Sequence, residues 1–501
     1  MNWLFANCKP EEDLFFPEFI NSLEISVANI QYTLYYDARE WKSPSIYKFE
    51  DKTIIISGWF VLNGEKNNLE SLFTEIKKLG LKETLNNIEL GVFTGVFFDG
   101  SDSYMFADYL SLSHHFYTKT KNGVKISPII NYLINEDSIF NEHAQKILNK
   151  TGYLLGNDTV YNNINRIPPG CIVNLSDYKE EVYFHFNNSN QIKVEYIPVV
   201  IKDIISLWDK RYRNIALSSG FDSRLIYACG DFKYVYTFGP EKSYDRKSAL
   251  KLFKIKNDID SRYDGFNFAE NEAPDYLKKL NKILFEGAAT VPFEDKFIAS
   301  FYHAFTHSEN EYVTFDGFLG DALQRGTLLH IKNRISKLLK TFPILNKNYL
   351  TSNKLIISRY GKEVGNSYVL PLYEHFLNIY NLKDSINSYL LFEIMYGRNT
   401  RYIINGATVL KGINNISVPV FAHRIVFETL ILQDFVDTIS YKTFKKLWRN
   451  IPKSIKKVPS EMLYSVMTPR FFIPFFIFIG RIVTFKISAF YNYANEHKLK
   501  N

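Results

Sequence analysis

Residues 215–224 read IALSSGFDSR, and their types and order could bind phosphate. The apolar residues 215–217 are typical of the end of a buried strand, and the small residues 218–220 then allow a sharp turn. A helix is predicted to begin near Asp222. Free backbone N–H groups at such a turn and the positive end of a helix dipole attract anions, and an Asp beside them suits Mg²⁺. The spacing is not that of the Walker or dinucleotide-binding glycine motifs, so we expect a phosphate site of another type.

The elements that must position this loop follow a repeating order. A helix is predicted over 197–208, before the loop, while a second strand over 234–238 and a second helix over 246–254 follow it. Alternating strands and helices predict a parallel, doubly wound sheet, with the ligand at the carboxyl ends of its strands. Residues beyond about Lys332 are expected to be mostly helical.

The first part of the chain has a different pattern, in which short strand-forming runs are separated by turn signals. Helical spacing occurs at 69–79 and 143–150. We therefore expect an α+β domain over 1–190, a polar linker in the Asn-rich stretch 183–193, and an α/β domain over 195–490. The predicted strands of the first domain are 53–56, 92–98, 104–107, 124–127 and 172–175.

Composition narrows the class of protein. The chain has 501 residues, of which 46% are hydrophobic, and its formal net charge is +7. No basic stripe with interleaved aromatic residues indicates a nucleic-acid partner. The three cysteines lie far apart and match no zinc or disulfide spacing. Because the N-terminus also lacks the pattern of a secretory signal, we expect a cytoplasmic protein.

The apolar run Phe471–Ile479 is about half as long as a helix that spans a bilayer. Two interpretations stay open. The run could form a buried helix, or the segment 471–490 could lie in the interface of an anionic membrane, since lysines and arginines flank it. In the second case the protein would be peripheral at the inner face of the membrane.

Several segments resemble motifs of the asparagine synthetase B family, and they occur in that family's order. The loop 218–223 resembles the Ser-Gly-Gly-x-Asp-Ser pyrophosphate loop of ATP pyrophosphatases, with Ser219 in place of the second-position glycine. The other segments are 91–99 (GVFTGVFFD), 106–117, 156–170 (GNDTVYNNINRIPPG), 315–321 (FDGFLGD), the pair Arg398 and Arg401, and 418–424 (VPVFAHR).

The resemblance implies a fold and a site. The fold would be an Ntn-hydrolase-like domain of the class II glutamine amidotransferase type, followed by a doubly wound ATP-pyrophosphatase domain with a helical C-terminal part. Asp222 and Asp321 would hold Mg²⁺, and Asp321 would serve catalysis. Ser460 stands at the position of the family's catalytic lysine, so the nearby Lys457 is expected to stabilise the oxyanion. The residues expected to contact ATP or pyrophosphate are Leu217, Ser218, Ser219, Gly220, Asp222, Ser223, Thr237, Phe238 and Gly317.

The chain departs from the family at its glutaminase site. The family's nucleophile is a cysteine directly after the initiator methionine, and this chain has Asn2 there. An amide is not a nucleophile, and Cys8 has no free amine beside it to act as base. We therefore expect no glutamine hydrolysis. Phe318 and Ala322 replace two family glutamates, so substrate handling is also expected to differ.

The expected function is that of an ATP-dependent carbon–nitrogen ligase, with ATP and Mg²⁺ as cofactors. A carboxylate-bearing substrate would be adenylated with release of pyrophosphate, and an amine, either ammonia or a group on the substrate, would then form the amide. Relatives without the cysteine include lasso-peptide cyclases and β-lactam synthetases. A precursor peptide and a sugar acid of a surface polysaccharide are therefore both open as substrates. Two alternatives remain, namely a glutamine-hydrolysing asparagine synthetase and a nucleotide-binding scaffold without turnover.

Overall fold

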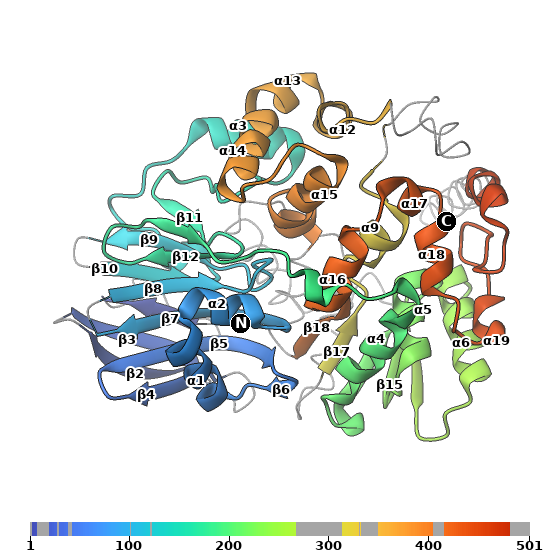
Figure 1. Cartoon of the computed structure of the whole chain (residues 1–501), viewed down its shortest axis with the longest axis horizontal. Coiled ribbons are helices and arrows are strands. Elements are labelled where there is room, and N and C mark those ends of the chain that lie inside the picture. Colours follow the sequence, from blue (N-terminus) through green and yellow to red (C-terminus); the bar gives the residue numbers. More distant parts are fainter. Residues whose placement is uncertain are drawn as a thin grey trace, which may run out of the picture.

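The structure is a computed structural model that describes residues 3–7, 20–27, 30–38, 43–100, 102–120, 123–266, 313–329, 331, 349–403 and 415–480. Its N-terminal part forms two antiparallel sheets, and its C-terminal part forms a parallel five-stranded sheet surrounded by helices (Figure 1). The expected mixture of an antiparallel α+β part and a parallel α/β part is confirmed at this level. The Asn2 and Cys8 positions lie outside the described residues.

The two antiparallel sheets contain six and seven strands. Their orders are β11-β9-β10-β1-β3-β2 and β13-β12-β8-β7-β5-β4, with β6 paired to β5. The strands are β1 (Trp3–Ala6), β2 (Ile20–Val27), β3 (Ile30–Asp37), β4 (Ser45–Phe49), β5 (Lys52–Leu62), β6 (Glu65–Lys66), β7 (Leu90–Asp99), β8 (Asp102–Ala107), β9 (Phe116–Thr120), β10 (Gly123–Ser127), β11 (Ile164–Arg166), β12 (Cys171–Asn174) and β13 (Glu180–Val182). All five strands expected here are confirmed, as β5, β7, β8, β10 and β12. The other strands of the two sheets were not among those predicted, namely β1, β2, β3, β4, β6, β9, β11 and β13.

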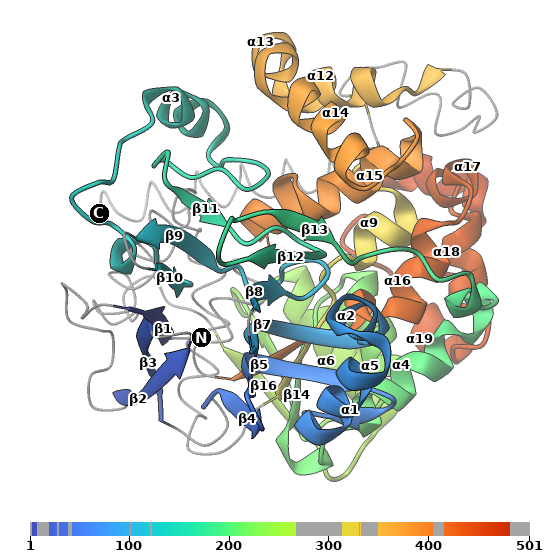
Figure 2. The same ribbon diagram turned by 60° about the vertical axis from the view of Figure 1, so that its left-hand side comes forward.

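The two sheets pack face to face, and the side chains of β5, β7, β8 and β12 alternate between two apolar cores. Ile55 and Phe98 join the cluster that includes Phe5 of the six-stranded sheet, and the Phe5 and Phe98 rings are 6.1 Å apart. Their neighbours Ile54 and Phe97 belong to the other cluster. Figure 2 shows α1 (Leu69–Leu79) and α2 (Leu81–Asn87) against this sheet on the side away from β1 to β3. A strand buried on both faces explains the nearly continuous apolar run of β7.

The parallel sheet places β14 at its centre, in the order β16-β15-β14-β17-β18. Every neighbouring pair in it is parallel, so the carboxyl ends of its strands lie along one edge. Its strands are β14 (Arg213–Ala216), β15 (Tyr234–Phe238), β16 (Arg262–Phe266), β17 (Val313–Asp316) and β18 (Ile416–Pro419). Helix α4 (Ile197–Ser206) precedes β14, α5 (Phe221–Cys229) connects β14 to β15, and α6 (Tyr244–Lys256) connects β15 to β16. The loops after β14 and β17 are therefore neighbours.

The described residues after position 331 are mostly helical, as expected, with one exception. The exception is β18, where four residues that carry no helical spacing form a strand beside β17. A buried polar contact helps to hold it, because Asn415 donates to the Thr314 hydroxyl at 2.6 Å. The remaining α-helices within the described ranges are α3 (Glu142–Thr151), α9 (Gly320–Arg325), α12 (Ser352–Tyr360), α13 (Lys362–Val364), α14 (Leu370–Ile379), α15 (Ile386–Met395), α16 (Arg424–Ile431), α17 (Phe435–Ile439), α18 (Lys442–Leu447) and α19 (Lys453–Lys456).

Buried arginines join the N-terminal and C-terminal parts. Arg166 donates to the carbonyl oxygens of Leu110 at 3.2 Å and Met395 at 3.1 Å. Arg401 donates to the carbonyl oxygens of Gly156 at 2.6 Å and Asp158 at 2.7 Å. Both arginine side chains are fully buried. The two parts therefore share an extensive polar interface.

The predicted linker stretch 183–193 is packed against the C-terminal part. Tyr183 and Phe184 are buried, and the backbone N–H of Asn187 donates to the Glu428 carboxylate at 3.2 Å. This polar stretch is therefore held by contacts with the C-terminal part, and its role as a linker between two domains stays a prediction. The asparagine-rich composition suggested a loop. The carboxylate that accepts the Asn187 N–H belongs to Glu428, which is far away in the sequence.

The apolar run after position 470 is exposed on one side. Phe471, Phe472, Phe475 and Phe478 keep between 58% and 64% of their surface exposed, whereas Ile473 is fully buried. The interpretation as a buried helix is therefore wrong for these four phenylalanines, whereas Phe476 packs against the core. Residues 481–490 lie outside the described part. Among the helices of the described residues, none is long and apolar enough to cross a bilayer.

Candidate functional site

The loop after β14 is closed by its own side chains. The backbone N–H of Ser218 donates to the Ser223 hydroxyl at 3.3 Å, and that of Gly220 donates to the Ser218 hydroxyl at 3.0 Å. The N–H of Ser219 donates to the Asp245 carboxylate at 2.8 Å. These acceptors hold the turn in shape. They also occupy three donors, so an anion bound to those donors would have to replace them.

The helix that follows the loop begins without a side-chain cap. Gly220 is the N-cap residue of α5, and it has no side chain to accept from the first N–H groups. The positive end of the helix dipole is therefore not offset by a capping oxygen. The expected combination of a small-residue turn and a helix start is thus present at residues 218–223.

Thr237 and Phe238 end the neighbouring strand β15 beside the loop. The Thr237 hydroxyl donates to the carbonyl oxygen of Leu217 at 2.6 Å, and Thr237 is buried. Phe238 is partly buried at the carboxyl end of the strand. The two expected contact residues therefore lie at the same edge of the sheet as the loop.

The loop after β17 lies in direct contact with the start of α5. A methyl group added at Gly317 would lie 2.9 Å from the Asp222 β-carbon, and one added at Gly320 would lie 2.8 Å from it. Between these glycines Leu319 has a φ of +70°, which is rare for a residue with a side chain. The close approach therefore depends on two glycines and one unfavourable backbone conformation.

Asp222 is bound by two side chains of α9. Gln324 donates to one of its carboxylate oxygens at 2.8 Å, and Arg325 forms an ion pair with the other at 3.1 Å. Desolvation raises the pKa of Asp222 to about 7, Arg325 opposes this rise, and the charge of Asp321 adds to it. Asp321 accepts a hydrogen bond from Thr327 at 2.9 Å. The two aspartates therefore affect each other electrostatically, with Arg325 as the local counter-ion.

The residues present suit Mg²⁺ only together with phosphate. Among the described residues, no group of three or more His, Cys, Asp or Glu side chains could hold a metal ion. Mg²⁺ commonly binds through one or two carboxylates, with waters and substrate phosphates as its other ligands. Asp222 and Asp321 fit that pattern. Arg325 is the cation with which such an ion would compete for Asp222.

Arg224 joins the loop to the C-terminal segment. Its guanidinium donates to the carbonyl oxygens of Ser219 at 2.6 Å, of Pro459 at 3.2 Å and of Val458. The backbone before Ser460 therefore lies beside the loop. Ser460 itself is buried, and its N–H donates to Tyr464.

Lys457 is exposed at the C-terminal end of α19. Among the contacts of the described residues, no hydrogen bond or ion pair joins its ammonium group to the loop. The structure therefore brings its backbone near the loop without placing its charge there. The segment after α19 also contacts the start of α5 through Tyr464. The rings of Tyr464 and Phe221 are 5.0 Å apart.

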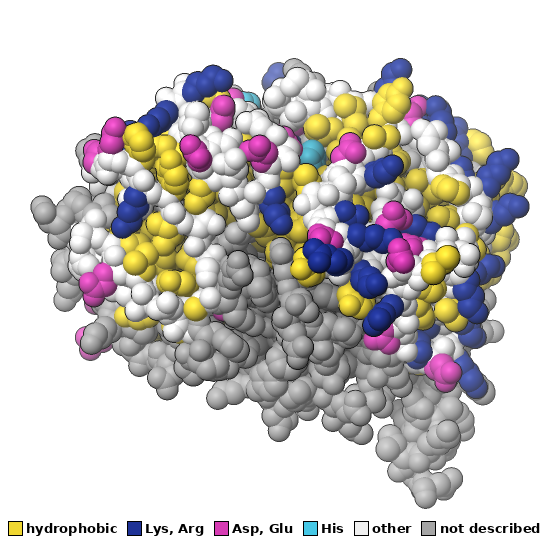
Figure 3. Space-filling view, turned by 90° about the horizontal axis from the view of Figure 1, so that it is seen from below, with side chains coloured by type: hydrophobic (Ala, Val, Ile, Leu, Met, Phe, Trp, Pro, Cys, Tyr) yellow, Lys and Arg dark blue, Asp and Glu magenta, His cyan; other side chains and the backbone are white. Residues whose placement is uncertain are grey.

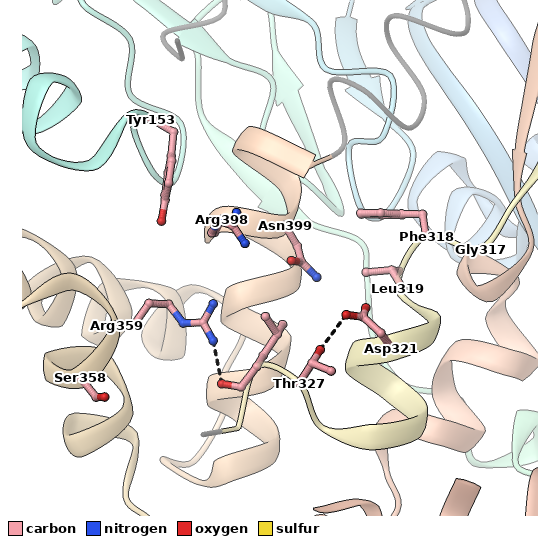
Figure 4. Close-up of a pocket in the computed structure, with 11 residues that line it drawn as sticks. Tyr153, Gly317, Phe318, Leu319, Asp321, Thr327, Ser358, Arg359, Arg398 and Asn399 are labelled. Carbon is pink, nitrogen blue, oxygen red and sulfur yellow. Dashed lines mark hydrogen bonds between the residues drawn. The ribbon is translucent and has the colours of Figure 1, made fainter. Parts of the chain in front are cut away.

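A cavity of about 540 Å³ lies beside the loop that follows β17 (Figure 4). It contains Gly317 and Asp321 of the expected site, but none of the residues 217–223 lines it. The full lining is Tyr153, Gly317, Phe318, Leu319, Asp321, Thr327, Leu328, Ser358, Arg359, Arg398 and Asn399. Sequence reasoning singled out Arg398 through the family resemblance, but it missed Tyr153 and Arg359. No local pattern marks either residue, because they reach the cavity from distant segments.

In the N-terminal part, Asp108 has a structural role. It accepts backbone N–H groups of Leu110, Leu112 and Ser113 at 3.2, 2.9 and 3.2 Å. Desolvation raises its pKa to about 7, and these hydrogen bonds oppose the rise. Asp108 therefore shapes the turn that follows β8.

Comparison with known proteins adds no assignment. No protein-family model matches this chain, and no match was found among curated proteins. The functional argument therefore depends on the residues and on their arrangement.

Proposed function

We propose that this protein is an ATP-dependent carbon–nitrogen ligase that activates a carboxylate as its adenylate. The observation that supports this most is the contact between the loops that follow the adjacent strands β14 and β17. That contact sets Asp222 and Asp321 near each other at the carboxyl edge of a parallel sheet, where ligands of such sheets bind. The ordered resemblance to the asparagine synthetase B family gives the reaction type.

The proposed reaction has two steps. An oxygen of the substrate carboxylate attacks the α-phosphorus of ATP, and the bond to the β-phosphate breaks with release of pyrophosphate. The nitrogen of an amine then attacks the acyl carbon, loses a proton, and displaces AMP. The amine would be ammonia or a group borne by a substrate, since Asn2 in place of the family cysteine argues against glutamine as the source.

The residues of the chain would bind and orient the nucleotide. The Ser218 and Ser223 hydroxyls and the uncapped start of α5 would bind the pyrophosphate, while Thr237 and Phe238 would lie near the adenine. Asp222 and Asp321 would hold Mg²⁺, which when bound neutralises phosphate charge. Lys457 would have to turn inward from its exposed position to stabilise the oxyanion.

ATP–pyrophosphate exchange tests the proposal. Purified protein is incubated with ATP, Mg²⁺, labelled pyrophosphate and single members of a panel of organic acids. We expect at least one acid to stimulate exchange, and Asp222→Asn and Asp321→Asn to abolish it. Asp203→Asn, an exposed change on α4, is the matched control. Exchange that survives both site variants would overturn the proposal.

One observation favours a second candidate, a nucleotide-binding protein without turnover. Arg325 already neutralises Asp222, and three backbone donors of the loop already have acceptors within the protein. Such a protein would bind ATP measurably by calorimetry and yet show no exchange with any acid. Exchange with even one acid excludes this candidate.

A further inference from the structure

The cavity behind the second loop has a chemical character that the proposed reaction does not yet use. Guanidinium groups of Arg359 and Arg398 line it, together with the Asn399 amide, and Asn399 is 6% exposed. Phe318 and Leu328 form an apolar part of the cavity lining. Its volume of about 540 Å³ is in the range of small-molecule sites.

Arg359 is held in place as a charged group. Its Nε lies 3.5 Å from a carboxylate oxygen of Glu393, which is completely buried and does not line the cavity. Tyr360 and Tyr389 donate to the same oxygen at 2.9 and 2.8 Å. Burial alone would lower the pKa of Arg359, but the Glu393 charge holds it above its ordinary value.

The arrangement leaves Arg359 donors for a ligand. A guanidinium has five N–H donors. On Arg359, the Leu328 carbonyl oxygen accepts from one terminal nitrogen at 2.8 Å, and the Tyr389 hydroxyl is a second hydrogen-bond partner of the side chain. The fixed, planar group is suited to bind carboxylate or phosphate oxygens through paired hydrogen bonds. Arg398 adds a second guanidinium to the same wall.

The two ends of the cavity differ in the side chains that line them. In Figure 4, Arg359 and Arg398 lie on the side near Tyr153, whereas Asp321 and Gly317 lie on the opposite side. Gly317 is the residue that touches Asp222 of the phosphate loop. A ligand in the cavity would therefore have one end at the arginines and its other end beside the proposed ATP site.

We propose that this cavity binds an organic anion as a substrate, through a carboxylate or phosphate group that is held by Arg359 and Arg398 and does not itself react. The reacting group of the same molecule would extend toward Asp321. The term substrate depends on the proposed ligase function, whereas the binding of an anion at the arginines does not.

Binding is measured by calorimetry without ATP, with glutarate, its monomethyl ester and 4-phosphonobutanoate as probes. The ester has nearly the size of glutarate but lacks one charge. We expect glutarate or the phosphonate to bind at least tenfold more tightly than the ester, and the stronger of the two identifies the anionic group. Equal binding of all three, or no binding, would overturn the proposal.

Variants locate the site. Arg398→Gln should remove the preference for the second charge, and so should Arg359→Gln combined with Glu393→Gln, which avoids an unpaired buried carboxylate. Arg211→Gln, at an exposed position, is the control and should bind as the unaltered protein does. Circular dichroism confirms that each variant is folded. A folded Arg398→Gln protein that keeps the full preference would contradict the assignment.

The two proposals can fail separately. If glutarate binds at the arginines but no acid stimulates pyrophosphate exchange, the anion site is supported and the ligase proposal is refuted. If glutarate and its monoester stimulate exchange equally, the ligase proposal is supported and the role of the two arginines is refuted.

Discussion

Asp222 is the residue on which the candidate site depends most. Its carboxylate lies between Gln324 and Arg325, and the charge of Asp321 opposes its ionisation. Without a metal, the Arg325 guanidinium supplies the compensating charge. Binding of Mg²⁺ with nucleotide would require the ionised form of Asp222.

The pH dependence of nucleotide binding follows from this pKa. Because desolvation raises the pKa of Asp222 to about 7, its carboxyl is mostly protonated at pH 6 and mostly ionised at pH 8. We expect affinity for ATP in the presence of Mg²⁺ to rise by about tenfold over that interval. Calorimetry at several pH values measures it.

Asp222→Asn provides the comparison, since it leaves the titration of ATP itself unchanged. The variant should show a much flatter profile, whereas the exposed Asp203→Asn should keep the full slope. If ATP affinity depends on pH identically in all three proteins, Asp222 does not contact the bound Mg²⁺–ATP.

At the scale of elements, the site depends on how closely two loops approach. Gly317 and Gly320 follow β17 and touch the first turn of α5, and Leu319 between them has a positive φ. Such a conformation costs about 1 kcal/mol for a residue with a side chain. The contact with Asp222 therefore has to be stabilised by the surrounding packing.

Gly317→Ala should separate the two loops. The added methyl would meet the Asp222 β-carbon at 2.9 Å and the Ser223 backbone nitrogen at 3.1 Å, so backbone must move. We expect a loss of about 1–3 kcal/mol in the free energy of unfolding, together with weaker ATP binding. Urea unfolding and calorimetry measure the two effects.

Gly64→Ala is the matched control for this change. An added methyl there meets no atom within 4 Å, and only the φ of +73° is unfavourable. It should cost about 1 kcal/mol and leave ATP binding unchanged. Wild-type ATP affinity in Gly317→Ala would show that the loop contact does not shape the nucleotide site.

At the scale of the whole molecule, Arg166 and Arg401 join parts of the chain that are distant in sequence. Arg401→Leu would remove the donor from the carbonyl oxygens of Gly156 and Asp158 and leave them buried. Each unpaired group costs about 1–3 kcal/mol, so we expect a loss of about 3 kcal/mol in unfolding free energy. The exposed Arg211→Leu should change it by less than about 0.5 kcal/mol. Equal stability of the two variants in urea unfolding would argue against this role.

The exposed phenylalanines after position 470 give a prediction about the surroundings of the molecule. Phe475 and Phe478 are 58% and 60% exposed, and the Arg470 guanidinium lies 4.9 Å from the Phe471 ring. Figure 3 shows many Lys and Arg side chains on the right-hand part of the face seen from below. Aromatic side chains beside basic ones suit the surface of an anionic membrane.

Vesicle sedimentation tests this contact. We expect the protein to sediment with vesicles containing phosphatidylserine. Phe475→Ser combined with Phe478→Ser should weaken binding by about tenfold, because two exposed aromatic side chains that would enter the membrane interface are lost. Ile259→Ser is the control, since Ile259 is 94% exposed and lies elsewhere. Sedimentation that is unchanged by the double substitution, or absent in the unaltered protein, would contradict the contact.

The sequence by itself determined several local elements, in the antiparallel part and at the candidate site. Helix α1 has the predicted bounds Leu69–Leu79, because its Asn68 cap and its periodic apolar residues lie within the segment. Strand β15 likewise has the predicted bounds, and the turn at 218–220 connects a strand to a helix as expected. These features depend on hydrogen bonds and periodicity over a few residues, which is the range that a sequence pattern contains.

Only the tertiary structure decided what surrounds Asp222. The ion pair with Arg325, the tether from Arg224 to Val458 and the meeting of Tyr153 with Arg359 in one cavity join segments that are far apart in the chain. Strand β18 and the docking of Asn187 on Glu428 were missed for the same reason. Strand order and packing set these contacts, because the burial and the hydrogen-bond partner of each group come from distant residues.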